Sequence, residues 1–423
     1  MSESRRFLHL CLATAVALLG LQLASCADVQ SGAEQAPPGT PTSGPSTHQT
    51  AQSPPSSAPG ARLPANLTTV GGPQIALLLP LTGRQSASAI AVRDGFLTAY
   101  YSLPAAGRPG LRIYDTAQMS VAAALTQATG DGAGLIVGPL TREEVAAAAA
   151  YSGPRPPMLT LNAVTGVPAA GNALYQFALA PEEEARQVAR RVVADGNRAG
   201  VALVPENDWG RRVLAAFTQE LAAAGGQLLD SASYDAGSTD YAAPITKVLR
   251  INESEARNKR LESVLGTRLT FQPRRRGDVA FIFSPGQAPQ ERLLRPQLRF
   301  YFAGDVPTYA TADAFEPNPN ANQDLDGLIF PDAPWMLGGG LVDSVRDATN
   351  AAWPTGGPKR NILFAFGFDA ARLATALRSM PGGNATSLSV DGLTGHLTIA
   401  ADGHVLRDLM WAQIRNGEPR LLN

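Results

Sequence analysis

The chain has 423 residues, with 35 lysines and arginines against 36 aspartates and glutamates, so its formal net charge is −1. A chain this close to neutrality gives no broad electrostatic case for binding nucleic acid. Its 44% hydrophobic and 17% charged residues are typical of a globular protein, and it contains only two cysteines, Cys11 and Cys26.

The first 25 residues have the pattern of a secretory signal peptide. Arg5 and Arg6 precede an apolar run that ends in small residues directly before Cys26. The tetrapeptide Leu-Ala-Ser-Cys resembles a bacterial lipobox, which implies that cleavage leaves Cys26 as the first residue, acylated on its thiol and on its new amine. Each buried CH₂ group contributes about 0.8 kcal/mol, so several acyl chains make a stable anchor. We therefore predict a lipoprotein anchored through Cys26.

A transmembrane helix over residues 7–23 is the alternative interpretation. That run is short for a span of about 20 residues, and Gly20 and Gln22 lie near its end. Residue 27 is alanine, whereas an aspartate there would resemble the signal that retains Gram-negative lipoproteins in the inner membrane. We therefore expect the protein to be anchored at the periplasmic face of the outer membrane. Cleavage would also leave Cys26 as the remaining cysteine, so no intramolecular disulfide is expected.

Residues 26–71 are predicted to form a disordered tether. The segment is rich in proline, serine and threonine and has almost no bulky aliphatic side chains. Such a composition cannot bury enough apolar surface to offset the entropy of ordering the chain. About 45 residues would span roughly 40 Å as a flexible coil and roughly 140 Å as extended polyproline II. The tether would then carry a folded domain away from the membrane.

From residue 72 onward, predicted strands and helices alternate as in repeated βαβ units, which indicates parallel sheet covered on both faces. A continuous apolar run predicts a strand at residues 75–79, and further strands are predicted at residues 111–114, 134–137 and 158–161. Helical spacing predicts helices at residues 87–101 and 121–129, and a capping box of Thr141 and Glu144 opens a third.

The alternation begins again at Pro181, where three glutamates follow in the first turn of a predicted helix. Further predicted elements are strands at 201–204, 279–283, 300–303 and 327–330, a loop at 207–210 and a helix at 211–224. About 350 residues are too many for one such sheet, so we predict two α/β lobes, each a mostly parallel sheet flanked by helices. The predicted boundaries are 72–180 plus about 320–365 for lobe 1, and 181–319 plus the C-terminal segment for lobe 2.

Motifs in a fixed order resemble the type I periplasmic-binding-protein fold. They are Pro80-Leu81-Thr82-Gly83, Arg93-Asp94-Gly95, Gly138-Pro139-Leu140-Thr141, Asn207-Asp208-Trp209-Gly210 with Gly225-Gly226, and Gly392-Leu393-Thr394-Gly395 with Asp402-Gly403. The resemblance covers residues 72–423. It implies the same two-lobed architecture, with a cleft between the lobes.

A narrower resemblance is to the penicillin-binding protein activator lipoproteins. Its motifs lie at residues 93–101, 273–276, 294–298 and 324–327, with Pro334-Trp335 beyond them. The resemblance implies an outer-membrane lipoprotein that activates a class A penicillin-binding protein, a peptidoglycan synthase, by direct contact. It covers only the C-terminal domain of that family. We expect no counterpart of the N-terminal helical-repeat domain of the longer members, and we expect the proline-rich tether to stand in its place.

No catalytic or metal-binding motif is found in the sequence. His9 lies in the signal peptide and His48 in the tether, while His396 and His404 have no cysteine or further histidine at zinc-ligand spacing. The chain has neither a G-x-S-x-G motif nor a P-loop. Its glutamate pairs fall in helix first turns, where the helix dipole explains them. We therefore expect a protein that is not an enzyme and binds no metal or cofactor.

A small ligand, if one binds, is expected between the lobes at the carboxyl ends of the strands. Thr82, Thr141 and Asn162 are the candidates there, because helix N-termini and backbone N–H groups favour a carboxylate. Trp209, in a loop after a strand, is a fourth cleft candidate. These residues support an alternative function, a receptor lipoprotein for an amino acid or amide. An outer-membrane anchor does not suit delivery to an inner-membrane permease, which favours the activator.

Arg274, Arg275 and Arg276 form the densest basic run of the chain. Such a run is either a solvated loop or a docking patch for an acidic protein surface or an anionic peptidoglycan strand. We treat it as the candidate surface for contact with the partner.

Overall fold

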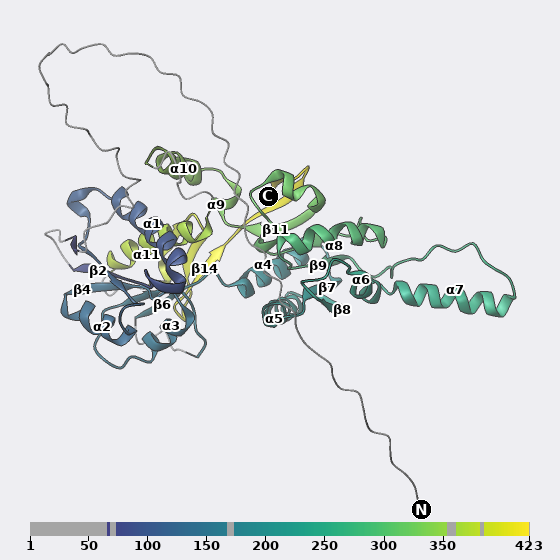
Figure 1. The fold of residues 1–423 in the computed structure, drawn as a ribbon, viewed down its shortest axis with the longest axis horizontal. Helices are drawn as coiled ribbons and strands as arrows, with labels where there is room; N and C mark the ends of the chain where they lie inside the picture. The colour runs from purple at the N-terminus through teal and green to yellow at the C-terminus, as the bar shows by residue number, and fades with distance from the viewer. Residues whose placement is uncertain (1–65, 68–72, 167–172, 353–360, 381–384, 423) are drawn as a thin grey trace, which may run out of the picture. The chain divides into compact units, whose positions relative to one another are not determined.

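The computed structural model describes residues 66–67, 73–166, 173–352, 361–380 and 385–422 (Figure 1). The predicted signal peptide, Cys26 and the tether apart from residues 66–67 lie outside these ranges. Within them, no helix combines the length and the apolar character needed to cross a bilayer. Residues Leu63–Asn423 form one structural unit, whose strands belong to two separate sheets, called sheet A and sheet B here.

Sheet A is the centre of lobe 1. Its strands are β1 (Asn66–Leu67), β2 (Gln74–Leu79), β3 (Leu111–Asp115), β4 (Ala133–Val137), β5 (Met158–Thr160), β6 (Leu174–Phe177), β12 (Ser389–Asp391), β13 (His396–Ile399) and β14 (His404–Asp408). They lie in the order β1-β3-β2-β4-β5-β6-β14-β13-β12. Pairing is parallel from β3 to β14, and the outer strands β1, β13 and β12 pair antiparallel.

Helices cover both faces of sheet A, because its central strands are apolar on both faces. In β2, Leu77 packs towards α1 (Ser86–Ser102) and α11 (Ile362–Arg378), and Leu78 packs towards α2 (Val121–Gly130) and α3 (Arg142–Ala149). The predicted capping box of Thr141 and Glu144 opens α3. The short α9 (Pro334–Leu337) and α10 (Leu341–Ala352) add to the core on the α1 face.

Sheet B is the centre of lobe 2. Its strands are β7 (Ala199–Pro205), β8 (Gln227–Tyr234), β9 (Phe281–Phe283), β10 (Thr308–Tyr309), β11 (Leu328–Asp332), β15 (Met410–Arg415) and β16 (Glu418–Leu422), and their order is β16-β15-β11-β10-β9-β7-β8. Pairing is parallel from β11 to β8, and the hairpin of β15 and β16 pairs antiparallel to β11. Short 3₁₀ helices are η1 (Gly83–Gln85), η2 (Ala105–Gly107), η3 (Ala312–Ala314), η4 (Pro319–Leu325) and η5 (Ala385–Ser387).

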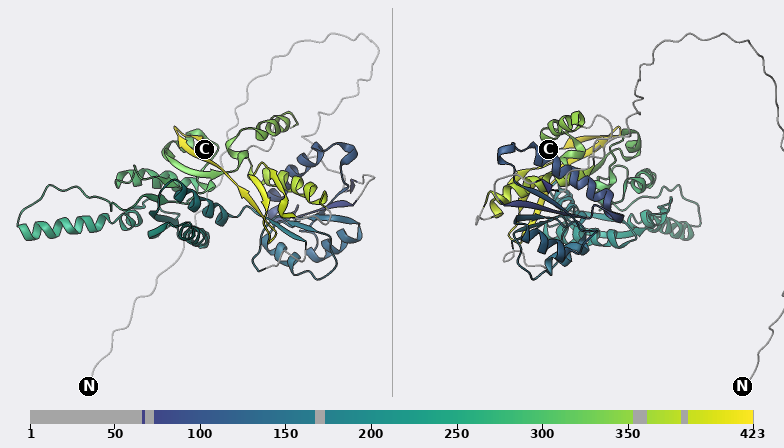
Figure 2. Two further views of the ribbon diagram at one scale, coloured as in Figure 1. Left: turned by 180° about the vertical axis from the view of Figure 1, so that it is seen from behind. Right: turned by 60° about the vertical axis from the view of Figure 1, so that its left-hand side comes forward.

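Helices also cover both faces of sheet B. α4 (Pro181–Ala194) and α5 (Asp208–Ala223) pack on one face, and α6 (Ala242–Val248) and α8 (Ala288–Phe300) pack on the other. α7 (Ile251–Leu265) differs, since its buried residues are Ile251 and Ser254 in its first turn. Beyond that turn, α7 extends away from the sheet (Figures 1 and 2).

Two local predictions in lobe 2 are wrong. Residues 300–303 are the end of α8 and the turn after it, not a strand. Here the helical spacing of the buried Leu294 and Leu298 outweighs the aromatic run that suggested a strand. Asp208–Gly210 form the first turn of α5 instead of a loop, because the side chain of Asn207 accepts a hydrogen bond from the Gly210 N–H (2.7 Å) and caps the helix.

The lobe boundaries also differ from the predicted ones. β11 belongs to sheet B and not to lobe 1, whereas β12, β13 and β14, expected in lobe 2, belong to sheet A. His404 on β14 lies opposite Gln176 on β6, 228 residues earlier. Hydrophobic periodicity cannot assign such long-range pairings to one sheet or the other. At the other edge, Asn66 and Leu67 were assigned to the tether and form β1 against β3.

Candidate functional site

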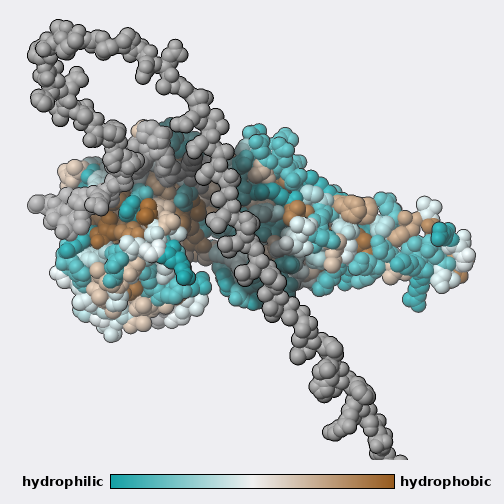
Figure 3. All heavy atoms as spheres, viewed as in Figure 1, coloured by the Kyte–Doolittle hydropathy of each residue, from teal (hydrophilic) through white to brown (hydrophobic). Residues whose placement is uncertain are grey.

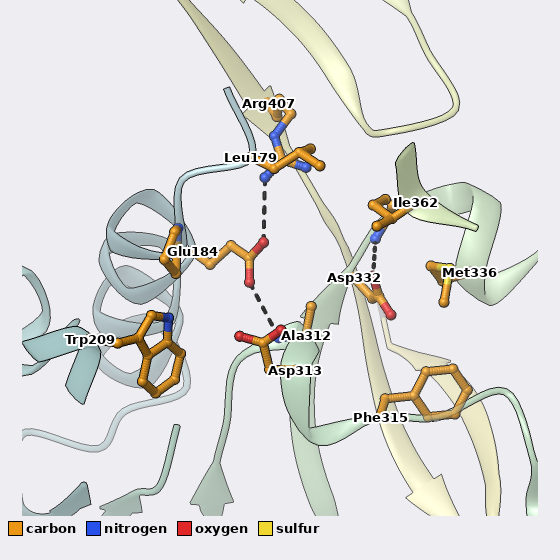
Figure 4. Close-up of a pocket in the computed structure, with 12 residues that line it drawn as sticks. Leu179, Glu184, Trp209, Ala312, Asp313, Phe315, Asp332, Met336, Ile362 and Arg407 are labelled. Atoms are coloured by element: carbon orange, nitrogen blue, oxygen red, sulfur yellow. Dashed lines mark hydrogen bonds and ion pairs between the residues drawn. The ribbon is translucent and has the colours of Figure 1, made fainter. Parts of the chain in front are cut away.

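Within the described residues, the chain passes between the lobes after β6, after β11 and after β14. A cavity of about 440 Å³ lies beside these crossings (Figure 4). Its apolar lining residues are Leu179, Pro181, Trp209, Ala312, Phe315, Ala333, Met336 and Ile362, and its charged lining residues are Glu184, Asp313, Asp332 and Arg407. The cavity therefore takes residues from both lobes.

Arg407 and Glu184 form an ion pair that joins the lobes at this cavity. Arg407 lies on β14 and is only 5% exposed, and its Nη2 is 3.4 Å from Oε1 of Glu184 on α4 (Figure 4). Arg407 Nη1 also donates to the carbonyl oxygen of Thr394 (3.4 Å), and Glu184 Oε2 accepts from the N–H of Ala312 (3.3 Å). Burial raises the pKa of Glu184, and the charge of Arg407 opposes that rise.

Gln187 and Asp332 make further polar contacts where the chain passes between the lobes. Gln187 Nε2 donates to the carbonyl oxygen of Arg407 (2.7 Å), and its Oε1 accepts from the N–H of Leu409 (3.1 Å). Asp332, at the end of β11, accepts from the N–H of Ala333 (2.7 Å). Burial raises the pKa of Asp332 well above its usual value, and the charge of Arg407 lowers it. Arg407 therefore stabilises buried carboxylates that belong to separate crossing segments.

The acidic lining of the cavity disfavours an anionic guest. Glu184 and Asp332 are acidic side chains, and Asp313 adds a third at an exposed position. The guanidinium of Arg407 is already engaged by Glu184 and Thr394. The carboxylate of a free amino acid would therefore approach acidic side chains.

Of the four predicted cleft residues, one lies at the cavity between the lobes. Trp209 lines this cavity, but Thr82, Thr141 and Asn162 do not. Thr82 Oγ1 donates to Asp115 (2.8 Å), Thr141 caps α3, and Asn162 Nδ2 donates to a backbone carbonyl oxygen (3.1 Å). Thr141 thus acts within its own loop, whereas Thr82 and Asn162 each join their loop to a neighbouring segment, at Asp115 and at Leu140.

No sequence motif links Glu184 and Arg407, which lie 223 residues apart. Glu184 is one of three acids in a helix first turn, where the helix dipole already accounts for it. Arg407 carries a weak signal, because it occupies a buried position of β14 while the neighbouring Leu406 is exposed. A charged residue at a buried position of a strand indicates that its charge is paired with another buried group.

Acidic residues neutralise part of the predicted basic patch. Arg275 Nη2 lies 2.8 Å from Asp305 Oδ2, and Arg276 Nε lies 2.6 Å from Asp278 Oδ1. Arg274 is exposed, and no acidic side chain in the described part of the chain forms an ion pair with it. The run is therefore not a uniformly basic surface, and Arg274 is its available cation.

The two histidines of the folded unit each lie beside an aspartate. His396 Nδ1 is 2.7 Å from Asp391 Oδ1, and His404 Nδ1 is 3.1 Å from Asp402 Oδ2. Across the ranges that the structure describes, no three histidine, cysteine, aspartate or glutamate side chains are arranged to hold a metal ion.

Comparison with known proteins adds a family match. A family model described as LppC putative lipoprotein matches residues 47–417. The chain is 28% identical over 342 residues to the penicillin-binding protein activator LpoA of Photobacterium profundum, covering 80% of this chain and 55% of that protein. It is 30% identical over 352 residues to the LpoA of Vibrio antiquarius, covering 80% of this chain and 56% of that protein. The chain thus spans about half the length of these curated relatives.

Solved structures show the same fold. The LpoA (YraM) C-domain from Haemophilus influenzae, described as a regulator of PBP1A, matches with a TM-score of 0.64 at 22% identity, covering 83% of this chain and 100% of that chain. The leucine-binding protein LivK from Thermotoga maritima matches with a TM-score of 0.51 at 18% identity, covering 83% of this chain and 98% of that chain. At these identities the likeness concerns the fold alone. The predicted two-lobed, type I periplasmic-binding-protein-like fold is confirmed.

Proposed function

The chain belongs to the LppC putative lipoprotein family, and on that premise we propose that it is a lipoprotein that activates a class A penicillin-binding protein. The observation that carries the proposal is the shared name of the curated relatives, penicillin-binding protein activator, over 80% of this chain. The partner is a peptidoglycan synthase, and the outcome is regulation of peptidoglycan synthesis.

The proposed location is the periplasmic face of the outer membrane. The acylated Cys26 is the anchor, and the alanine at position 27 favours the outer over the inner membrane. In this arrangement the folded unit meets both the synthase and, through its basic residues, the peptidoglycan strands. The tether provides part of the distance to a partner in the inner membrane.

Activation is proposed to occur by contact and without catalysis by this chain. A partner shifts the synthase towards its active state only if it binds that state more tightly than the resting state. A coupling of 1–3 kcal/mol, about 5–150-fold in the equilibrium, is the usual range of such effects. The curated relatives are likewise named as activators and not as enzymes.

We expect the mature chain, beginning at Cys26 and dissolved in detergent, to accelerate glycan polymerisation by the class A synthase of the same organism. The rate of lipid-linked precursor consumption is measured with and without equimolar activator. A leucine-binding protein of the same fold serves as the control, since it shares the architecture and not the proposed partner. An unchanged polymerisation rate with the mature chain would contradict the proposal.

Shortening the tether tests whether the folded unit needs its length to reach the synthase in cells. Replacing residues 28–65 by about a dozen residues keeps Cys26 and β1 but reduces the maximal span of the tether roughly threefold. Activation in cells should be lost, whereas activation in detergent solution should be retained. A tether of unchanged length and shuffled order is the control. Normal growth and cell shape with the short tether would show that reach does not depend on this segment.

A receptor for an amino acid or amide is the second candidate function, because a cavity between the lobes is present and LivK shares the fold. The acidic lining of the cavity argues against a carboxylate ligand. A thermal-shift panel of amino acids and amides should therefore leave the melting temperature unchanged. A true ligand at 100 times its Kd would add about 2.7 kcal/mol to the stability, which such a panel detects readily.

A further inference from the structure

We propose that a groove at the base of α7, centred on Phe302, binds an acidic, apolar segment of the synthase; this inference rests on the proposed function. The groove has a volume of about 400 Å³, and its lining includes Pro273, Arg274, Arg275, Phe302 and Asp305. It is called the Phe302 groove below. It does not share residues with the cavity between the lobes.

Hydrogen bonds hold the walls of the Phe302 groove in place. The segment after α7 returns along the helix, because the Arg274 N–H donates to Ser254 Oγ (3.2 Å) and the Arg276 N–H donates to the Leu249 carbonyl oxygen (2.9 Å). Arg275 Nε donates to the carbonyl oxygen of Phe302 (2.9 Å), which ties this segment to the turn after α8. The groove is thus preformed, and binding there requires little ordering.

Phe302 occupies a backbone conformation that normally selects glycine. Its φ is 61°, in the left-handed region, directly after the end of α8. The Phe302 N–H donates to the Arg299 carbonyl oxygen (3.2 Å) and the Ala303 N–H donates to the Leu298 carbonyl oxygen (2.9 Å), the pattern of a Schellman C-cap. A side chain with a Cβ is strained at this position, and glycine is the usual choice.

Burial does not compensate for this strain. The Phe302 side chain is 40% exposed, and the nearby Phe300 is 74% exposed. Strained residues that folding does not require cluster at functional sites. Exposed aromatic side chains beside a preformed groove are typical anchors of protein interfaces. The phenyl group of Phe302 is therefore assigned to binding.

The charge around the groove determines the chemistry of the partner. Arg274 is exposed at the groove. On α7, the exposed Arg257, Lys259 and Arg260 are balanced by Glu253, Glu255 and Glu262, so Arg274 is the cation that the groove offers to a partner. Apolar side chains also reach the surface on α7 and in the segment after it, as the brown atoms among hydrophilic ones show (Figure 3). A complementary surface carries carboxylates around an apolar side chain. Protein segments offer both, since acidic residues and bulky apolar side chains occur side by side in them.

Two other occupants are less suitable. The tether of this chain has almost no bulky apolar side chains to place beside Phe302. In a two-fold contact through this groove, a second copy of the folded unit would bring Arg274 against Arg274, and like charges at short distance repel. The synthase is therefore the occupant to which the inference commits.

The test uses the full-length lipidated protein in detergent and the purified synthase. Phe302→Gly removes both the phenyl group and the backbone strain. We expect the melting temperature to rise by about 2 °C while the Kd for the synthase weakens by at least about tenfold. Arg274→Glu should weaken the binding of the synthase more at low salt than at high salt, because salt screens the interaction between exposed charges. Asn416→Gly is the matched control, since Asn416 also has a positive φ (55°) but lies in the hairpin of β15 and β16.

The outcomes separate this inference from the proposed function. If the unmodified protein activates the synthase and Phe302→Gly binds it within about twofold of the unmodified affinity, the groove assignment is overturned and the proposed function stands. If the unmodified protein neither binds nor activates, both are overturned. A change in self-association of the isolated protein, measured by sedimentation of Phe302→Gly, would assign the groove to a second copy and overturn the inference as well.

Discussion

Replacing Gly367 by alanine is expected to lower the free energy of unfolding by about 3 kcal/mol. A Cβ atom at Gly367, on α11, would overlap the carbonyl oxygen of Val92 on α1. Likewise, a Cβ at Gly95 on α1 would overlap the carbonyl oxygen of Phe364 on α11. The two helices therefore touch through their backbones, and backbone atoms cannot move aside as a flexible side chain can.

This contact lies at the centre of lobe 1. α1 and α11 pack together over Leu77 and the neighbouring residues of sheet A, so separating them opens the core on that face. Gly95 belongs to the motif at residues 93–101 that resembles the activator lipoproteins, and helix packing is a physical reason for a glycine there. Gly95→Ala should have an effect of similar size, and the double variant should show less than the sum.

The measurement is urea-induced unfolding followed by near-ultraviolet circular dichroism. Gly107→Ala is the control, because a Cβ at Gly107 in η2 would meet no atom within 4 Å. That variant should be as stable as the unmodified protein or slightly more stable. A loss of less than about 1 kcal/mol for Gly367→Ala would mean that the helices separate easily and that the backbone contact is not tight.

Replacing Arg407 by methionine is expected to cost about 3–5 kcal/mol at neutral pH. Methionine keeps much of the volume of the side chain and removes its charge. Glu184 and Asp332 would then remain buried with no guanidinium to compensate them. The cost arises from these unpaired carboxylates, because the ion pair itself contributes little beyond the desolvation of its two partners.

The pH dependence of this cost has a definite sign. Burial raises the folded-state pKa values of Glu184 and Asp332 above their unfolded values, and removing Arg407 raises them further. A carboxyl group with a raised folded pKa favours the folded state most below its unfolded pKa, near pH 4, and loses that contribution as the pH rises through the folded pKa. The stability difference between Arg407→Met and the unmodified protein should therefore be smallest near pH 4 and grow towards pH 7.

Two further variants test the cause. Adding Glu184→Gln to Arg407→Met should restore part of the lost stability at pH 7, because it removes one of the unpaired charges. Arg415→Met is the control for a methionine on a strand, since Arg415 is exposed on β15. A deficit for Arg407→Met that does not change between pH 4 and pH 7 would attribute it to packing and not to charge.

Local structure was largely predictable from the order of residues. Continuous apolar runs identified β2 and β7, because a strand covered by helices on both faces has no polar face to display. Thr141 and Glu144 identified the start of α3, since a capping box acts within four residues. The alternation of strands and helices then indicated two α/β lobes. Local signals failed at residues 300–303, where helical packing of α8 overrode an aromatic run.

The sites were less predictable, because their residues come from distant segments. Trp209 was the one predicted cleft residue that reaches the cavity between the lobes. Glu184 and Arg407 meet only because β14 joins sheet A and brings the chain back between the lobes. The strain at Phe302 is equally hidden, since it depends on where α8 ends.

The order of residues by itself determined the predicted anchor at Cys26, the composition of the tether, the elements of both lobes and the family resemblance, because short-range propensities and motifs carry that information. The tertiary structure decided which strands share a sheet, which charges lie buried together and which aromatic side chain stays at the surface at a cost in strain. The physical reason is that burial, pairing and desolvation depend on contacts between residues hundreds of positions apart, and no local pattern records those contacts.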